Sequence, residues 1–314
     1  MIARAASSGT FASYLFQLQD TLSQAAGNKQ TQSDFLTQKQ QDTQTTSDAL
    51  SQASQTLSDV NDQVESAGES VLNITPFVYC DITTGTPTAT AQGKDEVLQS
   101  LNQASMGMNQ LAGNFSNTQL TFGSGSDQMN GLPSSVSQTA TQIKQCISLI
   151  ELAKGTLPSG DSRIGNLNDA EKLLSTVDQG SANETASVTP LPGGFSKTQT
   201  YITQASGNAT NASASYTSAI TDAGLITCQG NCGPANFDGS FPPEGEGVII
   251  GADTTSYAIS LAQSQTAAVG QNLTQASQAL SDFQKQLSTA SPLVSSANAN
   301  VQKANGIVSQ IGAQ

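Results

Sequence analysis

The sequence predicts a mainly α-helical protein: an elongated antiparallel helical bundle with long coiled-coil-like N- and C-terminal helices and a loop-rich, disulfide-bearing region. Apolar residues recur at alternating spacings of three and four over long stretches, which is the pattern of helices that pack on one another. Glycine and proline gather in a few short segments, which predicts loops between the helices. Only 36% of the 314 residues are hydrophobic and 11% are charged, so ordered packing must depend on how the apolar residues are phased.

The longest apolar stripe lies at the C-terminal end of the chain. From Ile259 to Ile311, steps of alternately three and four residues meet an apolar residue at every position except Thr266. A stripe of this length must be buried against another helix. We expect it to form an assembly seam whose larger side chains are Val269, Leu273, Leu280, Phe283, Leu287, Val294, Val301, Val308 and Ile311.

The N-terminal region supplies a second stripe with the same spacing, from Leu50 to Ile74. Before it, a shorter apolar pattern that begins at Phe11 predicts a helix ending near Gly27. The polar stretch over 28–46 contains neither proline nor glycine. We therefore expect this stretch to be the exposed opening of the long helix that carries the second stripe.

Residues 1–75 and 254–314 are predicted to pair as a stem, while 76–253 should hold middle helices and irregular loops. Apolar positions at helical spacing predict the middle helices over 97–111, 136–150, 164–177 and 202–223. Composition predicts the irregular loops over 76–94, 178–195 and 224–253. The first of these loops is expected to be irregular or a short hairpin, and the last to contain one short strand around Ile249.

The four cysteines are disulfide candidates: Cys80, Cys146, Cys228 and Cys232. An even number, mostly in loop-like segments, favours two disulfides and an oxidising compartment, so we expect an extracellular or cell-surface location. Free thiols are one alternative. A zinc site of four thiolates is another, although only Cys228 and Cys232 are close in sequence. Three pairings of four cysteines are possible, and the sequence does not choose among them.

Charge argues against several classes of partner. The net charge is −13, and the 11 lysine and arginine residues are scattered along the chain. We therefore expect no binding to nucleic acid and no electrostatic adsorption to anionic lipid. No apolar run approaches the roughly 20 residues that span a bilayer, so no transmembrane segment is predicted. No apolar stretch follows Arg4, so no signal peptide is expected at this end.

The residues that usually carry catalysis are scarce. Histidine, the commonest general base and metal ligand, does not occur in the sequence. Neither a nucleophile elbow nor a phosphate-binding loop is present. We therefore expect no enzyme activity, no cofactor and no metal. Carboxylates in the last loop are the better candidates for calcium, but their spacing matches no EF-hand: Asp238, Glu244, Glu246 and Asp253.

The low charge of the C-terminal stripe bears on function. Between Ile259 and Ile311 the charged residues are Asp282, Lys285 and Lys303. Salt bridges therefore cannot select its partners, and close packing must do so. We predict an extracellular or cell-surface structural protein that self-assembles, as a filament, sheath or coat subunit, through low-charge helical faces. The alternative is a helical adhesin or receptor-binding ectodomain in which the cysteine-bearing loops form the recognition tip and a host or surface receptor is the partner.

Overall fold

The computed structural model describes residues 2–312, with side chains described over 10–311. It is 81% helical, so the predicted mainly-α helical bundle is confirmed. Its elements within this range, in chain order, are α1 (Ile2–Leu72), β1 (Thr75–Cys80), β2 (Pro87–Gln92), α2 (Lys94–Gly123), α3 (Ser126–Gly155), α4 (Ser162–Val188), α5 (Leu191–Gly224), β3 (Thr227–Asn231), β4 (Glu246–Ile250) and α6 (Ala252–Gly312).

The chain forms two compact units, and α1 and α6 contribute residues to both. Unit 1 also contains α3 and α4, whereas unit 2 also contains most of α2 and α5 and all four strands. The segments of unit 1 are Met1–Thr45, Phe122–Thr198 and Ala279–Gln314, and those of unit 2 are Thr46–Thr121 and Gln199–Gln278.

In unit 1, α1 and α6 lie side by side and run antiparallel. The amide of Gln19 donates to the carbonyl of Val308 (3.3 Å), and the amide of Gln302 donates to the carbonyl of Ala26 (2.9 Å). The partner's number falls along α6 as the number rises along α1, which is the mark of an antiparallel pair. Helices α3 and α4 complete the unit, and the side chain of Asp161 caps the start of α4.

The polar stretch over 28–46 is helical as expected and exposes one face, but its other face is buried, which the prediction of an exposed stretch missed. Lys29 is fully buried and its ammonium pairs with the carboxylate of Glu184 on α4. Lys39 is 2% exposed and its ammonium pairs with Asp42 at 2.7 Å. These polar groups can enter the core because each finds a partner there, whereas an unpaired buried charge would be costly.

The linker predicted over 178–195 is also wrong. Helix α4 continues to Val188, and α5 begins at Leu191 after a two-residue turn. Leu191 and Phe195 are buried, and the Phe195 ring stacks on that of Phe122 at 4.8 Å between centroids. Pro192 is tolerated because it lies in the first turn of α5, where its missing N–H would have no helical partner. Burial of the apolar side chains therefore outweighs the loop-like composition.

Other helices extend beyond their predicted bounds. Helix α2 passes through Gly113 and ends at Gly123, and α3 begins at Ser126, before Pro133. Helix α6 is likewise continuous through Pro292. Tertiary packing can outweigh the low helix propensity of glycine and proline, so neither residue ends these helices.

Unit 2 packs the remaining parts of α1 and α6 with α2 and α5. The face of α5 that enters the core is rich in alanine, and Tyr216 is the large side chain within it. The Tyr216 hydroxyl hydrogen-bonds to that of Thr266 at 2.7 Å. This bond explains the single polar residue in the C-terminal stripe: Thr266 is the buried partner of the tyrosine.

The predicted assembly seam is part of the core of its own chain. Its nine side chains are at most 5% exposed, because they pack against other helices of the same unit. They are therefore not available to a second subunit, and the prediction that they form an intermolecular seam is corrected.

Candidate recognition site on the paired hairpins

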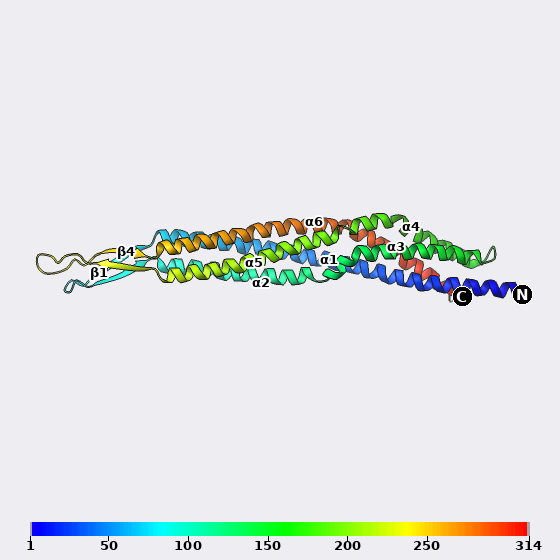
Figure 1. Ribbon diagram of the computed structural model, residues 1–314, viewed down its shortest axis with the longest axis horizontal. Helices are drawn as coiled ribbons and strands as arrows, with labels where there is room; N and C mark the ends of the chain where they lie inside the picture. The colour runs from blue at the N-terminus through cyan, green and yellow to red at the C-terminus, as the bar shows by residue number, and fades with distance from the viewer. Residues whose placement is uncertain (1, 313–314) are drawn as a thin grey trace. The chain divides into compact units, whose positions relative to one another are not determined.

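Two β-hairpins project from the helix ends of unit 2 (Figure 1). Strands β1 and β2 pair antiparallel from Thr75↔Gln92 to Cys80↔Pro87, so the segment over 76–94 is a hairpin. Strands β3 and β4 pair from Thr227↔Ile250 to Asn231↔Glu246. The segment over 224–253 therefore contains two strands, where the sequence predicted one.

The hairpins pack face to face through small residues. A side chain at Gly230 would place its Cβ 2.6 Å from Val78, and one at Gly247 would place it 2.7 Å from Pro76. Only glycine permits this approach, because any Cβ would overlap the facing strand. The glycines of this loop-like segment thus have a specific role, which is to let one hairpin lie on the other.

A disulfide fixes this packing. Cys80 at the end of β1 bonds to Cys232 just after β3, with 5.7 Å between their Cα atoms. The prediction of two disulfides is wrong in its second pair, since Cys146 and Cys228 are free within the described chain. Cys146 lies in the core of unit 1, on α3, whereas Cys228 lies on β3 of unit 2. The two thiols therefore belong to separately packed cores.

The segment that leads into β4 also joins the two hairpins. The N–H of Phe241 donates to the carbonyl of Ile82 (2.9 Å), and the N–H of Cys80 donates to that of Pro243 (3.0 Å). The Phe241 ring covers Gly85, whose φ of 66° and lack of a side chain suit it to this place. Backbone bonds, ring packing and the disulfide together make the hairpins one structural unit.

The turn between β1 and β2 is held by Asp81. Its Oδ1 accepts hydrogen bonds from the backbone N–H of Thr83 (2.7 Å) and of Thr84 (3.1 Å), and from the Thr83 hydroxyl. These bonds favour the charged form, so they lower the pKa of Asp81, with the Thr83 hydroxyl as the largest cause. The neighbouring side chain, Ile82, is 52% exposed.

The loop between β3 and β4 contains a turn built in the same way. Oδ1 of Asp238 accepts from the hydroxyl of Ser240 (2.6 Å) and from its backbone N–H (3.0 Å), and both bonds lower the pKa of Asp238. The backbone N–H of Asn236 donates to the carbonyl of Ser240 at 2.6 Å. Phe237, within this turn, is fully exposed.

Large apolar side chains are thus held in solvent on an ordered pair of hairpins. The hairpins and their turns carry six of them: Phe77, Tyr79, Ile82, Phe237, Val248 and Ile250. On β1, Phe77 and Tyr79 point out while Val78 and Cys80 point in, because side chains alternate along a strand. Phe77 and Tyr79 face away from the second hairpin, and Val248 and Ile250 face away from the first. The exposed strand residues therefore lie on the two outer sides of the pair, and Ile82 and Phe237 lie in its turns. We call these six residues and their turns the hairpin surface.

The charges within the two hairpin segments have one sign. Segments 75–92 and 227–250 contain four acidic residues and no lysine or arginine. Nor does any basic residue occur between Lys197 and Lys285. The four acidic residues are Asp81, Asp238, Glu244 and Glu246. This surface is therefore apolar and negative.

The sequence predicts a recognition tip in the cysteine-bearing loops only as the alternative function, and it does not identify the apolar residues there. One signal was available. Phe77, Val78 and Tyr79 form a β-prone run after Pro76, and alternation of exposed and buried positions follows from a strand. The pairing of the two hairpins had no such signal, because it joins segments about 150 residues apart in sequence.

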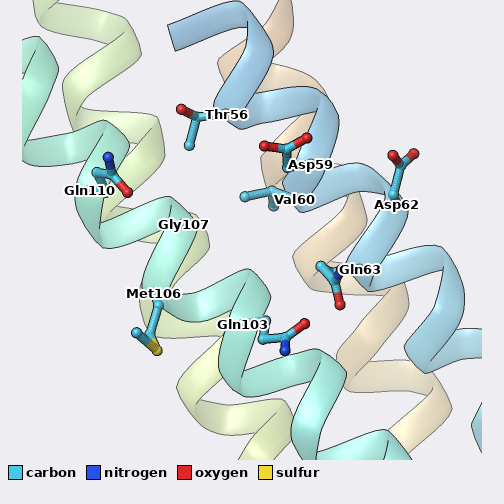
Figure 2. A pocket seen from close by; sticks show the side chains of 9 residues that line it. All are labelled: Thr56, Asp59, Val60, Asp62, Gln63, Gln103, Met106, Gly107 and Gln110. Carbon is cyan, nitrogen blue, oxygen red and sulfur yellow. The ribbon is translucent and has the colours of Figure 1, made fainter. Parts of the chain in front are cut away.

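A groove of about 620 Å³ lies between α1 and α2 within unit 2. Figure 2 shows it with Asp59 and Asp62 on α1 and with Met106 on α2, and Gly107 approaches Val60 across it. Its lining is otherwise mainly amides and a hydroxyl. Across the described range 10–311, no three histidine, cysteine, aspartate or glutamate side chains gather to hold a metal ion. The side chains that line the groove therefore suggest neither a catalytic site nor a metal site, and the hairpin surface is the stronger candidate for function.

Among the described residues, no helix has both the length and the apolar character needed to cross a membrane. Comparison with protein-family models, curated proteins and solved structures finds no match for this chain.

Proposed function

We propose that this protein is a helical recognition module of the adhesin or receptor-binding type, which binds a protein partner through its hairpin surface. The observation that carries the proposal is a group of large apolar side chains held in solvent by a disulfide-linked pair of hairpins. Exposing apolar surface is unfavourable in water, so a fold that holds it in place implies a partner that covers it.

Order in the hairpin surface supports binding further. A partner gains little from flexible loops, because ordering them on binding costs free energy. Here the disulfide, the glycine packing and the two aspartate turns fix the backbone before a partner arrives. Phe77, Tyr79 and Phe237 supply aromatic surface, which is enriched among the residues that dominate binding energy.

Self-assembly through the C-terminal stripe lacks comparable support. The side chains expected to form the seam are buried in their own chain. The extracellular location and the absence of enzyme activity stay predictions. The Cys80–Cys232 disulfide is compatible with an oxidising compartment.

Selection of peptides tests the proposal. A phage-displayed library of random peptides is panned against the wild-type chain, and each recovered clone is then tested against F237S/I82S. We expect most clones to lose binding to this variant. L120S is the matched control, because Leu120 is 73% exposed on α2 of the same unit and outside the hairpins.

Circular dichroism must show the same helix content for all three proteins. Clones that bind F237S/I82S and L120S as well as they bind wild type would refute the proposal, and so would a failure to recover any clone.

A further inference from the structure

The hairpin surface carries two turns of the same construction, one in each hairpin. In each, an aspartate Oδ1 accepts a backbone N–H and a hydroxyl, and an apolar residue stands beside the aspartate: Ile82 beside Asp81, and Phe237 beside Asp238. Both turns lie at the same end of the paired hairpins (Figure 1). The repetition places an apolar residue next to an ordered carboxylate twice at this end of the hairpins.

The carboxylates in these turns keep capacity for a partner. Thr83 and the backbone N–H of Thr84 donate to Oδ1 of Asp81, and Ser240 donates to Oδ1 of Asp238. Both aspartates are exposed, so a partner can reach their carboxylates. Because the same bonds lower their pKa values, both groups stay charged at acidic pH values where an ordinary aspartate begins to be protonated.

We infer that the partner presents an apolar pocket bordered by lysine or arginine side chains, and that it engages Ile82 and Phe237 together with Asp81 and Asp238. This inference rests on the proposed function and names the chemistry of its partner. Apolar side chains give such a contact its affinity, while opposite charges steer the approach and select the partner. Glu244 and Glu246 extend the same negative field, with no basic residue in the hairpin segments to offset it.

The same charges disfavour other classes of partner. Phosphate groups of nucleic acid and of anionic lipid would be repelled by four carboxylates and would meet no cation on this surface. A neutral membrane could accept Phe237 and Ile82, but insertion would bring Asp81 and Asp238 toward the hydrocarbon, where charge is costly. A protein whose apolar pocket is bordered by lysine or arginine can bury the apolar side chains and pair with the carboxylates.

The test uses the hairpin-dependent clones recovered by panning. We expect their sequences to combine aromatic or aliphatic residues with lysine or arginine and to contain few acidic residues. One such peptide is synthesised with a matched version in which glutamate replaces each basic residue, and both are titrated by fluorescence anisotropy. The acidic version should bind at least about tenfold more weakly.

Variants of the protein separate the two parts of the contact. D81N/D238N removes charge but keeps oxygens that can accept the turn hydrogen bonds. It should weaken the basic peptide about threefold to tenfold and leave the acidic peptide unchanged or better bound. Raising the salt to about 1 M, where the Debye length is about 3 Å, should reduce wild-type affinity to near that of the variant.

Each result has a defined meaning. Hairpin-dependent clones without basic residues, or equal binding of the two matched peptides, would overturn the inference and leave the proposed function in place. Failure to recover hairpin-dependent clones would overturn the proposed function itself. Binding of the wild-type chain, but not of F237S/I82S, to phosphatidylcholine vesicles would overturn the inference in favour of a lipid partner.

Discussion

Units 1 and 2 share the two longest helices but differ in what they bury and what they expose. Unit 1 buries complete ion pairs, Lys29 with Glu184 and Lys39 with Asp42. Unit 2 buries alanines around a tyrosine–threonine pair and exposes aromatic residues on its hairpins. The comparison shows that one repeating stripe supports two kinds of core, because the facing helices decide which side chains meet. Six of the large exposed apolar residues lie on the disulfide-linked hairpins of unit 2, and the others, among them Phe16 of unit 1, lie outside them.

The largest expected loss of stability comes from breaking the buried Lys29–Glu184 ion pair of unit 1. K29M would leave Glu184 buried without a cation, which should lower the free energy of unfolding by about 3–5 kcal/mol. The double variant K29M/E184L removes both charges and should recover most or all of that loss, because desolvation of the pair offsets much of its attraction. Urea denaturation of both variants measures the difference, and an equally unstable double variant would contradict it.

The loss of stability in K29M should depend on pH, because it arises from the unpaired charge of Glu184. Burial already raises the pKa of the Glu184 carboxyl, and loss of the ammonium should raise it further. A raised folded-state pKa favours the protonated form, so the deficit should be complete above that pKa. It should shrink as the pH falls toward the unfolded value of about 4.3. A deficit that does not change between neutral and acidic pH would show that packing, and not charge, causes the loss.

Removal of the disulfide should destabilise unit 2 and leave unit 1 unchanged. C80S/C232S removes the bond between residues 152 apart in sequence and should lower the stability of unit 2 by about 2–4 kcal/mol. Hydrogen exchange should quicken in 75–92 and 227–250 while α3 and α4 of unit 1 keep their protection. C228S, which removes a free thiol of β3, is the control and should change exchange little. Faster exchange spread evenly over both units would contradict the assignment.

A smaller effect tests how closely the helices of unit 2 approach. A Cβ at Gly107 would lie 2.5 Å from Val60, so G107A should destabilise by about 1–3 kcal/mol through overpacking. Gly113 lies on the same helix with nothing within 4 Å of its Cβ position, so G113A should instead stabilise by about 0.5–1 kcal/mol. Thermal unfolding followed by circular dichroism compares the two, and equal shifts in Tm would argue against the close contact.

The last prediction concerns reactivity and involves no change in stability. Burial raises the pKa of the Cys146 thiol to about 12, so this residue should resist alkylation at neutral pH in the folded protein. Cys228 is half-buried and should react with N-ethylmaleimide, as intact-mass spectrometry would show. C228S should then take up no reagent until denaturant is added. Labelling of Cys146 without denaturant would mean that the core of unit 1 opens readily.

The helical fold could be predicted because its cause is local. The spacing of apolar residues around Leu57 and Leu280 determines which side of each helix avoids water, and both are buried as the stripes require. The hairpin surface could be predicted only as a region. Exposure of Phe77 and Phe237 depends on the strand pairings and turns around them, which join residues far apart in the chain.

The sequence by itself determined the helical class, the apolar stripes and the acidic character of the loops, because periodicity and charge are properties of neighbouring residues. The tertiary structure decided which apolar residues are exposed, which cysteines pair and which charges are buried. Lys29 looks like an exposed polar residue until Glu184 lies opposite it. Cys80 could pair with any of three cysteines, and close packing of the two hairpins at their glycines brings it to Cys232. In both cases the favourable free energy comes from contacts between segments that are distant in sequence. Such contacts produce no periodic pattern of residues that could be recognised in the sequence.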